Sequence, residues 1–398
     1  MRSKNPPASA GSQVSAIPFW RDAGKRAFIF QLAALFTVGG LGYYLFSNTQ
    51  ANLARQSIAT GFDFLNKEAS FEIAESLIGY SAADTYARAL LVGVLNTLKV
   101  AFIGIILTTI LGTVIGVSRL SSNWLVSRLS ALFIEVMQNI PVLLQLFFWY
   151  AIFYEAFPAP QQALNPIKGV FLCNRGLIFA IPEAHNAHTV MGWILIAVLV
   201  GGWFLNRWAR RRQEAIGESF PVLRVTLFMA LLLPLLAWVA YGTPTAMNIP
   251  ELRGFNFSGG LSVSPEFSAL LLGLVLYTSA FVAEIVRAGI QSIGRGQIEA
   301  AMALGLRPGQ ILQLVILPQS LRVIIPPLTS QMLNLTKNSS LAVAIGYTDF
   351  VAVTNTTINQ TGQAIEGVAM IMAVYLLFSL STSVFMNWYN KRMALVER

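Results

Sequence analysis

The chain has 398 residues, of which 55% are apolar and only 11% are charged, whereas a soluble domain carries about 25% charged residues. Together with a mean hydropathy of +0.61, this excludes an ordinary soluble enzyme, a disordered protein and a disulfide scaffold, and it predicts a membrane protein with several spans. In such a protein the net charge of +9 reflects membrane orientation, so we expect no nucleic-acid partner. The single Cys173 gives no intrachain disulfide and no support for cysteine-ligated zinc.

A spanning helix needs about 20 mostly apolar residues. The sequence offers eight such stretches, which in chain order are 27–54, 89–118, 129–154, 189–206, 225–250, 267–290, 323–348 and 367–390. They are too long for soluble core helices, and the alternating ten-residue segments of a membrane β-barrel do not occur. We therefore predict an all-α integral membrane protein with about eight transmembrane helices. The first stretch lacks a cleavage site, so we expect it to be a retained helix.

The basic residues predict the orientation of these spans. If the N-terminus is cytoplasmic and the spans alternate, nineteen Lys and Arg residues fall on cytoplasmic segments and six on outer segments. Cytoplasmic segments of membrane proteins carry such an excess of positive charge. The count predicts that the tails 1–26 and 391–398 are both cytoplasmic. The outer segments are too short to form a separate enzymatic domain.

The segment 296–318, between the sixth and seventh stretches, predicts a compact helix–turn–helix on the cytoplasmic face. Good helix formers fill 297–304, and Gly305 stands where a helix end favours a residue that tolerates positive φ. Pro308 is suited to begin a second helix, and Pro318 to end it. Such a rigid loop with little polar chemistry indicates docking into the groove of a partner.

The spacing of Glu299-Ala300-Ala301, Gly305 and Leu317-Pro318 resembles the EAA signature of permease subunits in ATP-binding-cassette (ABC) importers. That family usually has Ile where Val315 stands. Three further segments, 96–99, 140–145 and 337–341, are similar, in the same order, to the histidine-permease-like subunits of bacterial importers for polar and general L-amino acids. One position departs from the pattern, since many relatives have Arg where this chain has Gln138.

The resemblance implies a five-helix permease core within a domain at 89–390. The residues 27–88 would add a first helix with a periplasmic segment. An inserted helix pair would lie at about 189–250. The resemblance also implies that the chain is a transport subunit of the bacterial inner membrane and not an enzyme, with no catalytic residues, metal or cofactor of its own. The chain lacks the G-x-x-x-x-G-K-[ST] phosphate loop. A separate ABC ATPase subunit would bind ATP and Mg²⁺ and dock on 296–318, with Glu299 at the docking face. A second permease subunit, identical or related, a periplasmic amino-acid-binding protein and the lipid bilayer would be the other partners.

Lys337 is a charge inside an apolar stretch, and intramembrane charges mark transport pathways. Its polar neighbours and the resemblance together give the candidate residues for the translocation path or substrate: Asn139, Pro141, Gln145, Asn334, Lys337, Asn338, Ser339 and Ser340. Two alternatives for Lys337 stay open, snorkelling to the interface or an ion pair with Glu135 or Asp349. Lys99, near the outer end of its stretch, is expected to be a snorkelling anchor.

Two rival functions make different demands on the sequence. A secondary amino-acid carrier driven by an ion gradient predicts two similar halves and acids near the membrane midplane, and neither occurs. A membrane enzyme needs a constellation of His, Asp or Cys, which His185, His188 and Cys173 do not supply. The two histidines are spaced to share a metal, but no third ligand is evident. Glu284 and Arg287, three residues apart, are expected to form a local ion pair.

Overall fold

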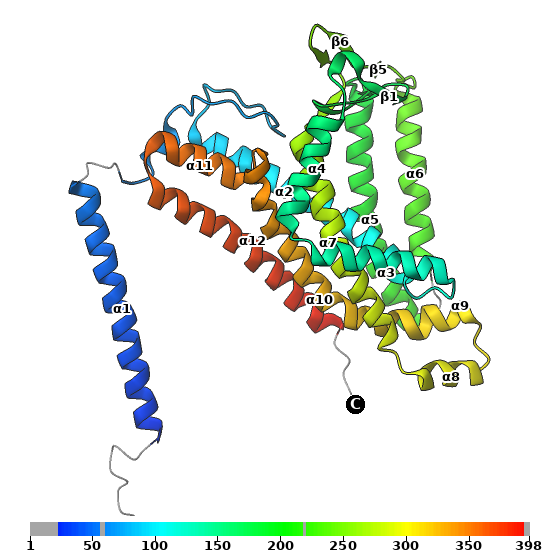
Figure 1. The fold of residues 1–398 in the computed structure, drawn as a ribbon. Coiled ribbons are helices and arrows are strands. Elements are labelled where there is room, and N and C mark those ends of the chain that lie inside the picture. Colours follow the sequence, from blue (N-terminus) through cyan, green and yellow to red (C-terminus); the bar gives the residue numbers. More distant parts are fainter. Residues whose placement is uncertain (1–22, 56–59, 218–219, 394–398) are drawn as a thin grey trace, which may run out of the picture.

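A computed structural model describes residues 23–55, 60–217 and 220–393. Most of these residues lie in helices, of which some stand upright and others are strongly tilted (Figure 1). Seven helical stretches are long and apolar enough to cross a membrane, and a bent helix pair provides an eighth. The helices in these seven stretches are α1 (Ala23–Arg55), α2 (Tyr86–Ser118), α5 (Asn186–Ile216), α6 (Val222–Ala240), α7 (Pro265–Gln291), α10 (Leu317–Asn338) and α12 (Ala364–Met393). The prediction of an all-α membrane protein with about eight spans is confirmed.

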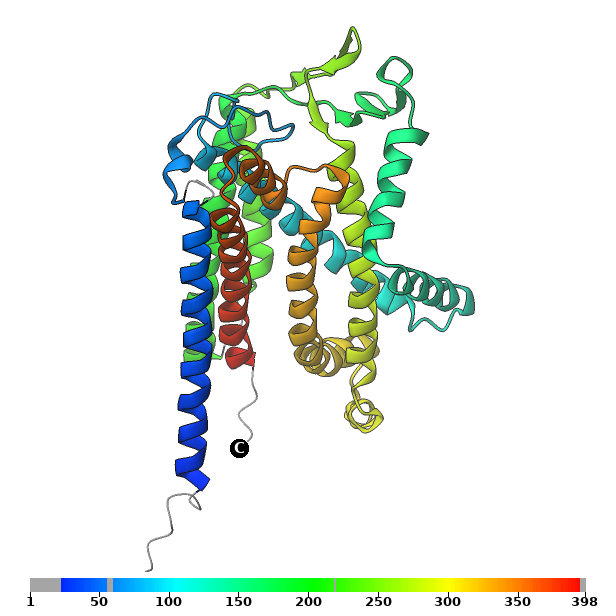
Figure 2. The ribbon, with the colours of Figure 1, turned by 60° about the vertical axis from the view of Figure 1, so that its left-hand side comes forward.

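The third predicted span, 129–154, is wrong as a single helix. It consists of α3 (Trp124–Asn139) and α4 (Val142–Ala151), the latter extended by the π-helical segment η3 (Ile152–Ala156), and the two parts meet at 103°. Ile140 between them has extended backbone, φ −97° and ψ 126°, because the residue before a proline avoids the helical region. Consequently α3 projects sideways, roughly at right angles to α4 (Figure 2).

The helices α2 and α7 form the centre of the domain. A Cβ atom at Gly112 would lie 2.6 Å from Val282 Cβ, and one at Gly116 would lie 2.5 Å from the backbone oxygen of Ala283. The two backbones therefore approach each other where α2 has no side chain, a packing that membrane helices favour. The helix α4 packs on α7 beside them, and Leu146, Leu270 and Leu274 are fully buried in the adjoining core.

Short strands at one end of the bundle were not predicted. A four-stranded antiparallel sheet has the order β1 (Leu164–Ile167), β2 (Val170–Cys173), β3 (Gly176–Phe179) and β8 (Leu261–Val263). Two further strand pairs are β4 (Ile181–Pro182) with β5 (Met247–Asn248), and β6 (Glu251–Arg253) with β7 (Asn256–Ser258). The predicted span 225–250 extends too far, because α6 ends at Ala240 and the chain then enters these strands.

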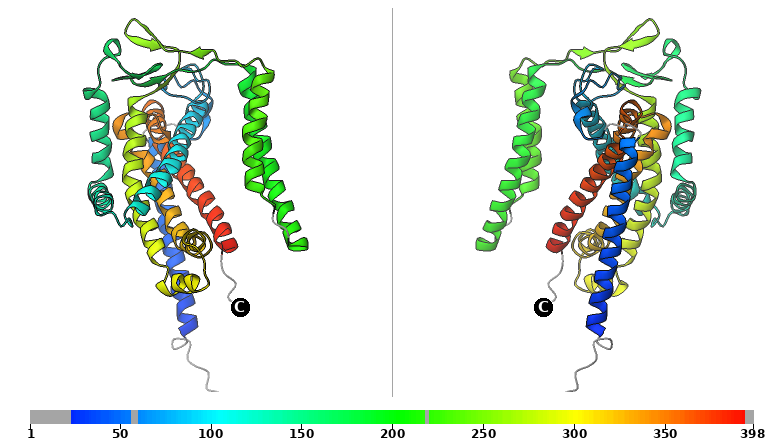
Figure 3. Two further views of the ribbon diagram at one scale, coloured as in Figure 1. Left: turned by 90° about the vertical axis from the view of Figure 1, so that its right-hand side faces the viewer. Right: turned by 90° about the vertical axis from the view of Figure 1, so that its left-hand side faces the viewer.

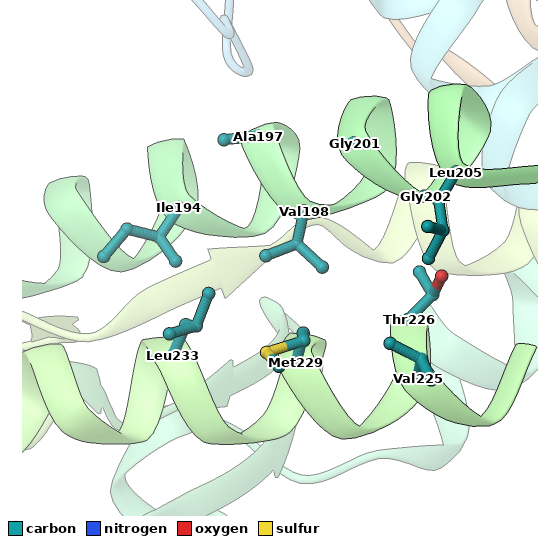
Figure 4. A pocket seen from close by; sticks show the side chains of 10 residues that line it. All are labelled: Ile194, Ala197, Val198, Gly201, Gly202, Leu205, Val225, Thr226, Met229 and Leu233. Carbon is teal, nitrogen blue, oxygen red and sulfur yellow. The ribbon is translucent and has the colours of Figure 1, made fainter. Parts of the chain in front are cut away.

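The hairpin of α5 and α6 and the helix α1 stand apart from the other helices. Figure 3 shows α5 and α6 separated from the other helices over most of their length. Ala187 and Ala209 are the buried residues of α5, and α6 has none. Between α5 and α6 runs an apolar pocket of about 410 Å³ into which Ile194, Val198 and Met229 point (Figure 4). Almost every described side chain of α1 is exposed, and this helix is clearly separate in Figure 1.

Opposite the sheets, the chain forms α8 (Arg295–Ala303), α9 (Pro308–Ile311) and the π-helical segment η5 (Leu312–Ile316) before α10. The start of α1 and the end of α12 lie at this same end of the bundle (Figure 1), so both ends of the described chain face the α8 side. The rest of the predicted tails lies outside the described residues. The remaining elements are α11 (Phe350–Thr361) and the 3-10 turns η2 (Asp63–Asn66), η4 (Pro160–Gln162) and η6 (Ser339–Ile345).

Candidate functional site

The turn after α8 is closed by two backbone hydrogen bonds. The Gly305 N–H donates to the Met302 oxygen at 2.9 Å, and the Leu306 N–H donates to the Ala301 oxygen at 3.2 Å. This pair of bonds is the Schellman helix end, which needs a residue with positive φ, and Gly305 has φ +77°. The prediction that Gly305 ends the first helix of the loop is confirmed.

The second helix of the loop begins as predicted but continues further. Pro308 is its first residue, and the Arg307 N–H donates to Gln310 Oε1 at 3.0 Å. Pro318, however, does not end it, because the chain passes through η5 directly into α10. Proline has no N–H for the oxygen of residue i−4, here Leu314, and the wider π-helical turn just before Pro318 accommodates that loss. The loop is therefore joined to a membrane helix without a break.

One surface of the loop mixes an acid with large apolar side chains. Glu299 and Ala300 are exposed on α8, Met302 is 59% exposed and Leu304 is 81% exposed. We call these four residues the coupling surface. Ala301, the third residue of the predicted signature, is instead buried and anchors α8 from inside. Exposed apolar side chains beside polar ones indicate a protein interaction site. Leu317 and Pro318 lie outside this surface, in the first turn of α10.

The candidates at the bend between α3 and α4 bond to nearby backbone. Gln145 is buried, and its Nε2 donates to the oxygens of Met137 (2.9 Å) and Ile140 (3.0 Å). Asn139 Nδ2 donates to the Glu135 oxygen at 2.7 Å. The two Gln145 bonds satisfy carbonyl groups that the interrupted helix leaves without partners, so this side chain supports the bend at Pro141, whereas Asn139 bonds within its own helix.

Gln138, the position at which many relatives have Arg, connects the same bend to the domain core. Gln138 Nε2 donates to the backbone oxygen of Ala280 on α7 at 3.2 Å. The amide thus links α3 to α7 without introducing a charge.

Lys337 lies in a groove of about 690 Å³ between the end of α10 and α12. Its polar lining is Lys337, Ser340, Tyr375 and Ser379, and the other lining residues are apolar. Within the described residues Lys337 makes no ion pair with Glu135 or Asp349, so that alternative is not realised. An ammonium at the side of a largely apolar groove suits a ligand with an anionic group.

The polar neighbours of Lys337 bond within their own segment. Ser339 Oγ donates to the Thr336 oxygen and Ser340 Oγ to the Lys337 oxygen, both at 2.7 Å. Asn334 is exposed and Asn338 is half-buried. Among the described residues, no hydrogen bond joins this group to the residues at the α3–α4 bend.

A buried carboxyl group near this groove was predicted only as a possible partner of Lys337. Asp349 is fully buried at the start of α11, where its Oδ1 accepts from the Ala352 N–H at 2.8 Å. Tyr375 donates its hydroxyl to Asp349 Oδ2 at 3.5 Å. Burial raises the pKa of the Asp349 carboxyl to about 7. The helix-capping role has a sequence signal, an Asp directly before a short apolar run.

Lys99 has an ion-pair partner, so the expectation of a snorkelling anchor is wrong. Its Nζ lies 2.8 Å from Glu75 Oε2 and 4.2 Å from the centroid of the Phe267 ring. Glu75 Oε1 accepts from the Ser264 N–H at 2.7 Å. Glu75 therefore connects the segment before α2 to the start of α7. The sequence gives no sign of this pair, because Glu75 lies in an irregular segment 24 residues before Lys99.

We expect Glu75→Gln to lower the free energy of unfolding by about 2 kcal/mol. Glutamine keeps the acceptor for the Ser264 N–H but places an amide donor beside the Lys99 ammonium. The matched control is Glu251→Gln, whose pair with Arg253 is exposed on both sides, at 72% and 73%. Thermal unfolding in detergent measures both variants, and equal midpoints would contradict the structural role of Glu75.

Two smaller predictions concern local contacts. Arg287 pairs with Glu284, as predicted, and its Nε lies 2.9 Å from Glu284 Oε2. His185 caps the start of α5 by accepting from the Ala187 N–H at 3.1 Å. Within the described ranges, His185 and His188 belong to no group of three side chains that could hold a metal.

Comparison with known proteins gives a family match over most of the chain. A family described as "binding-protein-dependent transport system inner membrane component" matches residues 104–395. The general L-amino acid transport system permease protein AapQ of Rhizobium johnstonii is 48% identical over 95% of this chain and 94% of its own length. The putative amino-acid ABC transporter permease protein YhdX of Escherichia coli is 47% identical over 94% of this chain and 95% of its own length. The glutamate/glutamine/aspartate/asparagine transport system permease protein BztB of Rhodobacter capsulatus is 40% identical over 98% of this chain and 99% of its own length.

Proposed function

Because the chain belongs to the family of inner-membrane components of binding-protein-dependent transport systems, we propose that it is the permease subunit of a bacterial ABC importer for L-amino acids. Relatives that match it over almost their full length carry the names of general L-amino acid and of glutamate, glutamine, aspartate and asparagine permeases. The family and these names favour this function over an ion-gradient carrier. Amino acids all carry a carboxylate, which suits the Lys337 ammonium in its groove.

The observation that carries the mechanism is the continuous connection from the coupling surface to the groove. The loop passes through η5 into α10, and Lys337 lies in the last turn of α10, directly before the η6 segment. A separate ATPase subunit, holding ATP and Mg²⁺, would bind Glu299, Met302 and Leu304. Its closure would move α8 and α9, and the unbroken helix would carry that displacement to the groove. The chain thus acts as a two-state gate whose populations its partners shift.

The other partners follow from the same arrangement. The ATPase would place the α8 end, and with it both termini, in the cytoplasm of a cell with an inner membrane. The sheets at the opposite end would face the periplasmic amino-acid-binding protein. The groove at Lys337 is open at the side of the single chain, and a second permease subunit, identical or related, would complete the path there. In this proposal α5 and α6 are an insertion and α1 an addition to a five-helix core.

Charge reversal at the coupling surface tests this function. We expect Glu299→Lys to lower ATP-driven amino-acid uptake by at least tenfold in vesicles that hold the assembled transporter, because the exposed acid would face the ATPase. The matched control is Glu214→Lys, an exposed acid at the end of α5 on the same side of the bundle. Normal uptake in Glu299→Lys, or uptake by the chain alone on an ion gradient without ATPase, would contradict the proposal.

A further inference from the structure

The end of α5 on the α8 side carries a basic and aromatic pocket that the transport function does not use. It has a volume of about 310 Å³ and is lined by Trp203, Asn206, Arg207 and Arg210 of α5 together with Trp388 of α12. The four α5 residues recur at intervals of three and four, so they share one face of the helix. The pocket lies where the α5–α6 hairpin meets α12, although the hairpin is separate from the other helices over most of its length (Figure 3).

Within the described ranges, no carboxylate compensates the charge of this pocket. The Arg207 guanidinium lies 4.0 Å over the centroid of the Trp203 ring. Within the described residues, neither Arg207 nor Arg210 forms an ion pair with a carboxylate. Two guanidinium groups and an amide supply several donors in the geometry that phosphate oxygens accept.

The surroundings of the pocket are apolar toward the middle of the membrane. On the same face of α5, Ile196 and Leu199 are more than half exposed. On α12, Val384 and Leu377 precede Trp388 by four and eleven residues, share its face and are also more than half exposed. Free phosphate would leave these apolar side chains without a ligand, whereas acyl chains would cover them. Tryptophan is typical of the boundary between headgroups and acyl chains.

We infer that the pocket binds the phosphate headgroup of an anionic phospholipid, whose acyl chains lie between α5 and α12. The lipid holds the hairpin against α12 at the end where the two helices approach each other. General attraction of basic residues to an anionic membrane surface does not distinguish among Arg207, Arg210, Arg211 and Arg212, whereas this site requires only the first two.

The experiment compares two double variants that lose the same charge from the same helix end. Arg207→Gln/Arg210→Gln removes the guanidinium groups of the pocket, and Arg211→Gln/Arg212→Gln removes the adjacent pair, neither member of which lines the pocket. The full-length chain, purified with the subunits that accompany it in membranes, is titrated with dioleoyl phosphatidylglycerol, and native mass spectrometry measures the lipid retained. We expect the unaltered chain and the second variant to retain one lipid per copy. The first variant should bind it at least tenfold more weakly.

Two further arms separate the sources of the phosphate group. Inorganic phosphate at millimolar concentration should not displace the lipid, and phosphatidylcholine, which has no net charge, should be retained more weakly than phosphatidylglycerol. Equal retention by the two double variants would overturn the site in favour of general surface attraction. Displacement by inorganic phosphate would overturn the assignment to a lipid. Neither result depends on transport activity, so the proposed import function is tested separately.

Discussion

Gly305→Pro is expected to abolish ATP-driven uptake while the chain still inserts into the membrane. Proline fixes φ near −65°, whereas Gly305 has φ +77°, and proline also removes the N–H that bonds to the Met302 oxygen. The turn between α8 and α9 would open, so α8 would no longer transmit movement of a docked ATPase to α10. Uptake and ATP hydrolysis measured together in the same vesicles check this, with hydrolysis continuing when uptake is lost.

A second proline in the same loop provides the control. Gly294 has φ −59°, a value that proline adopts without strain, and it lies directly before α8 instead of after it. Gly294→Pro is therefore expected to transport almost normally, and Gly305→Ala, which retains the N–H at a strained φ, to lie between the two. Normal coupling in Gly305→Pro would show that the turn transmits no force.

Gly116→Ala is expected to destabilise the domain by at least about 2 kcal/mol. The added Cβ would lie 2.5 Å from the backbone oxygen of Ala283, and a backbone atom cannot move aside as a flexible side chain does. The helices α2 and α7 would have to separate along the centre of the bundle, with loss of the packing around Val282 and Val286.

Gly192→Ala is the matched control, because it makes the same change within α5, where a Cβ would meet no atom within 4 Å. Alanine favours helix over glycine by about 1 kcal/mol, so this variant is expected to unfold at the same temperature as the unaltered chain or slightly higher. Thermal unfolding in detergent, followed by fluorescence and size exclusion, measures both. If the two variants unfold alike, the close approach of α2 and α7 is not what holds the domain together.

The features that the sequence predicted are local ones. Long apolar stretches predict spans, since a helix satisfies its own backbone within the membrane. The helix–turn–helix at 296–318 was predictable because Gly305 and Pro308 have backbone preferences that act over a few residues. Its extension beyond Pro318 was not, because a proline ends one helix and is tolerated in another according to what the preceding turn can adopt.

The break at Ile140-Pro141 had a sequence signal that the count of apolar residues outweighed. Pro141 restricts Ile140 before it and donates no hydrogen bond, yet the apolar length of 129–154 favours a single span. What stabilises the break is Gln145, which donates to Met137 and Ile140, and Gln138, which donates to Ala280. The last of these bonds depends on where α7 lies, which no local pattern specifies.

The sequence by itself determined the membrane class of the protein, the apolar stretches that could cross the membrane and the loop on which its partner is proposed to act, because each depends on the composition or backbone preference of neighbouring residues. Only the tertiary structure decided that Glu75 pairs with Lys99, that Gly116 is a point of close contact between α2 and α7, and that Arg210 shares a pocket with Trp388. These three join segments that are between 24 and more than 170 residues apart. Such contacts depend on how whole helices pack, and that information is spread over the entire chain.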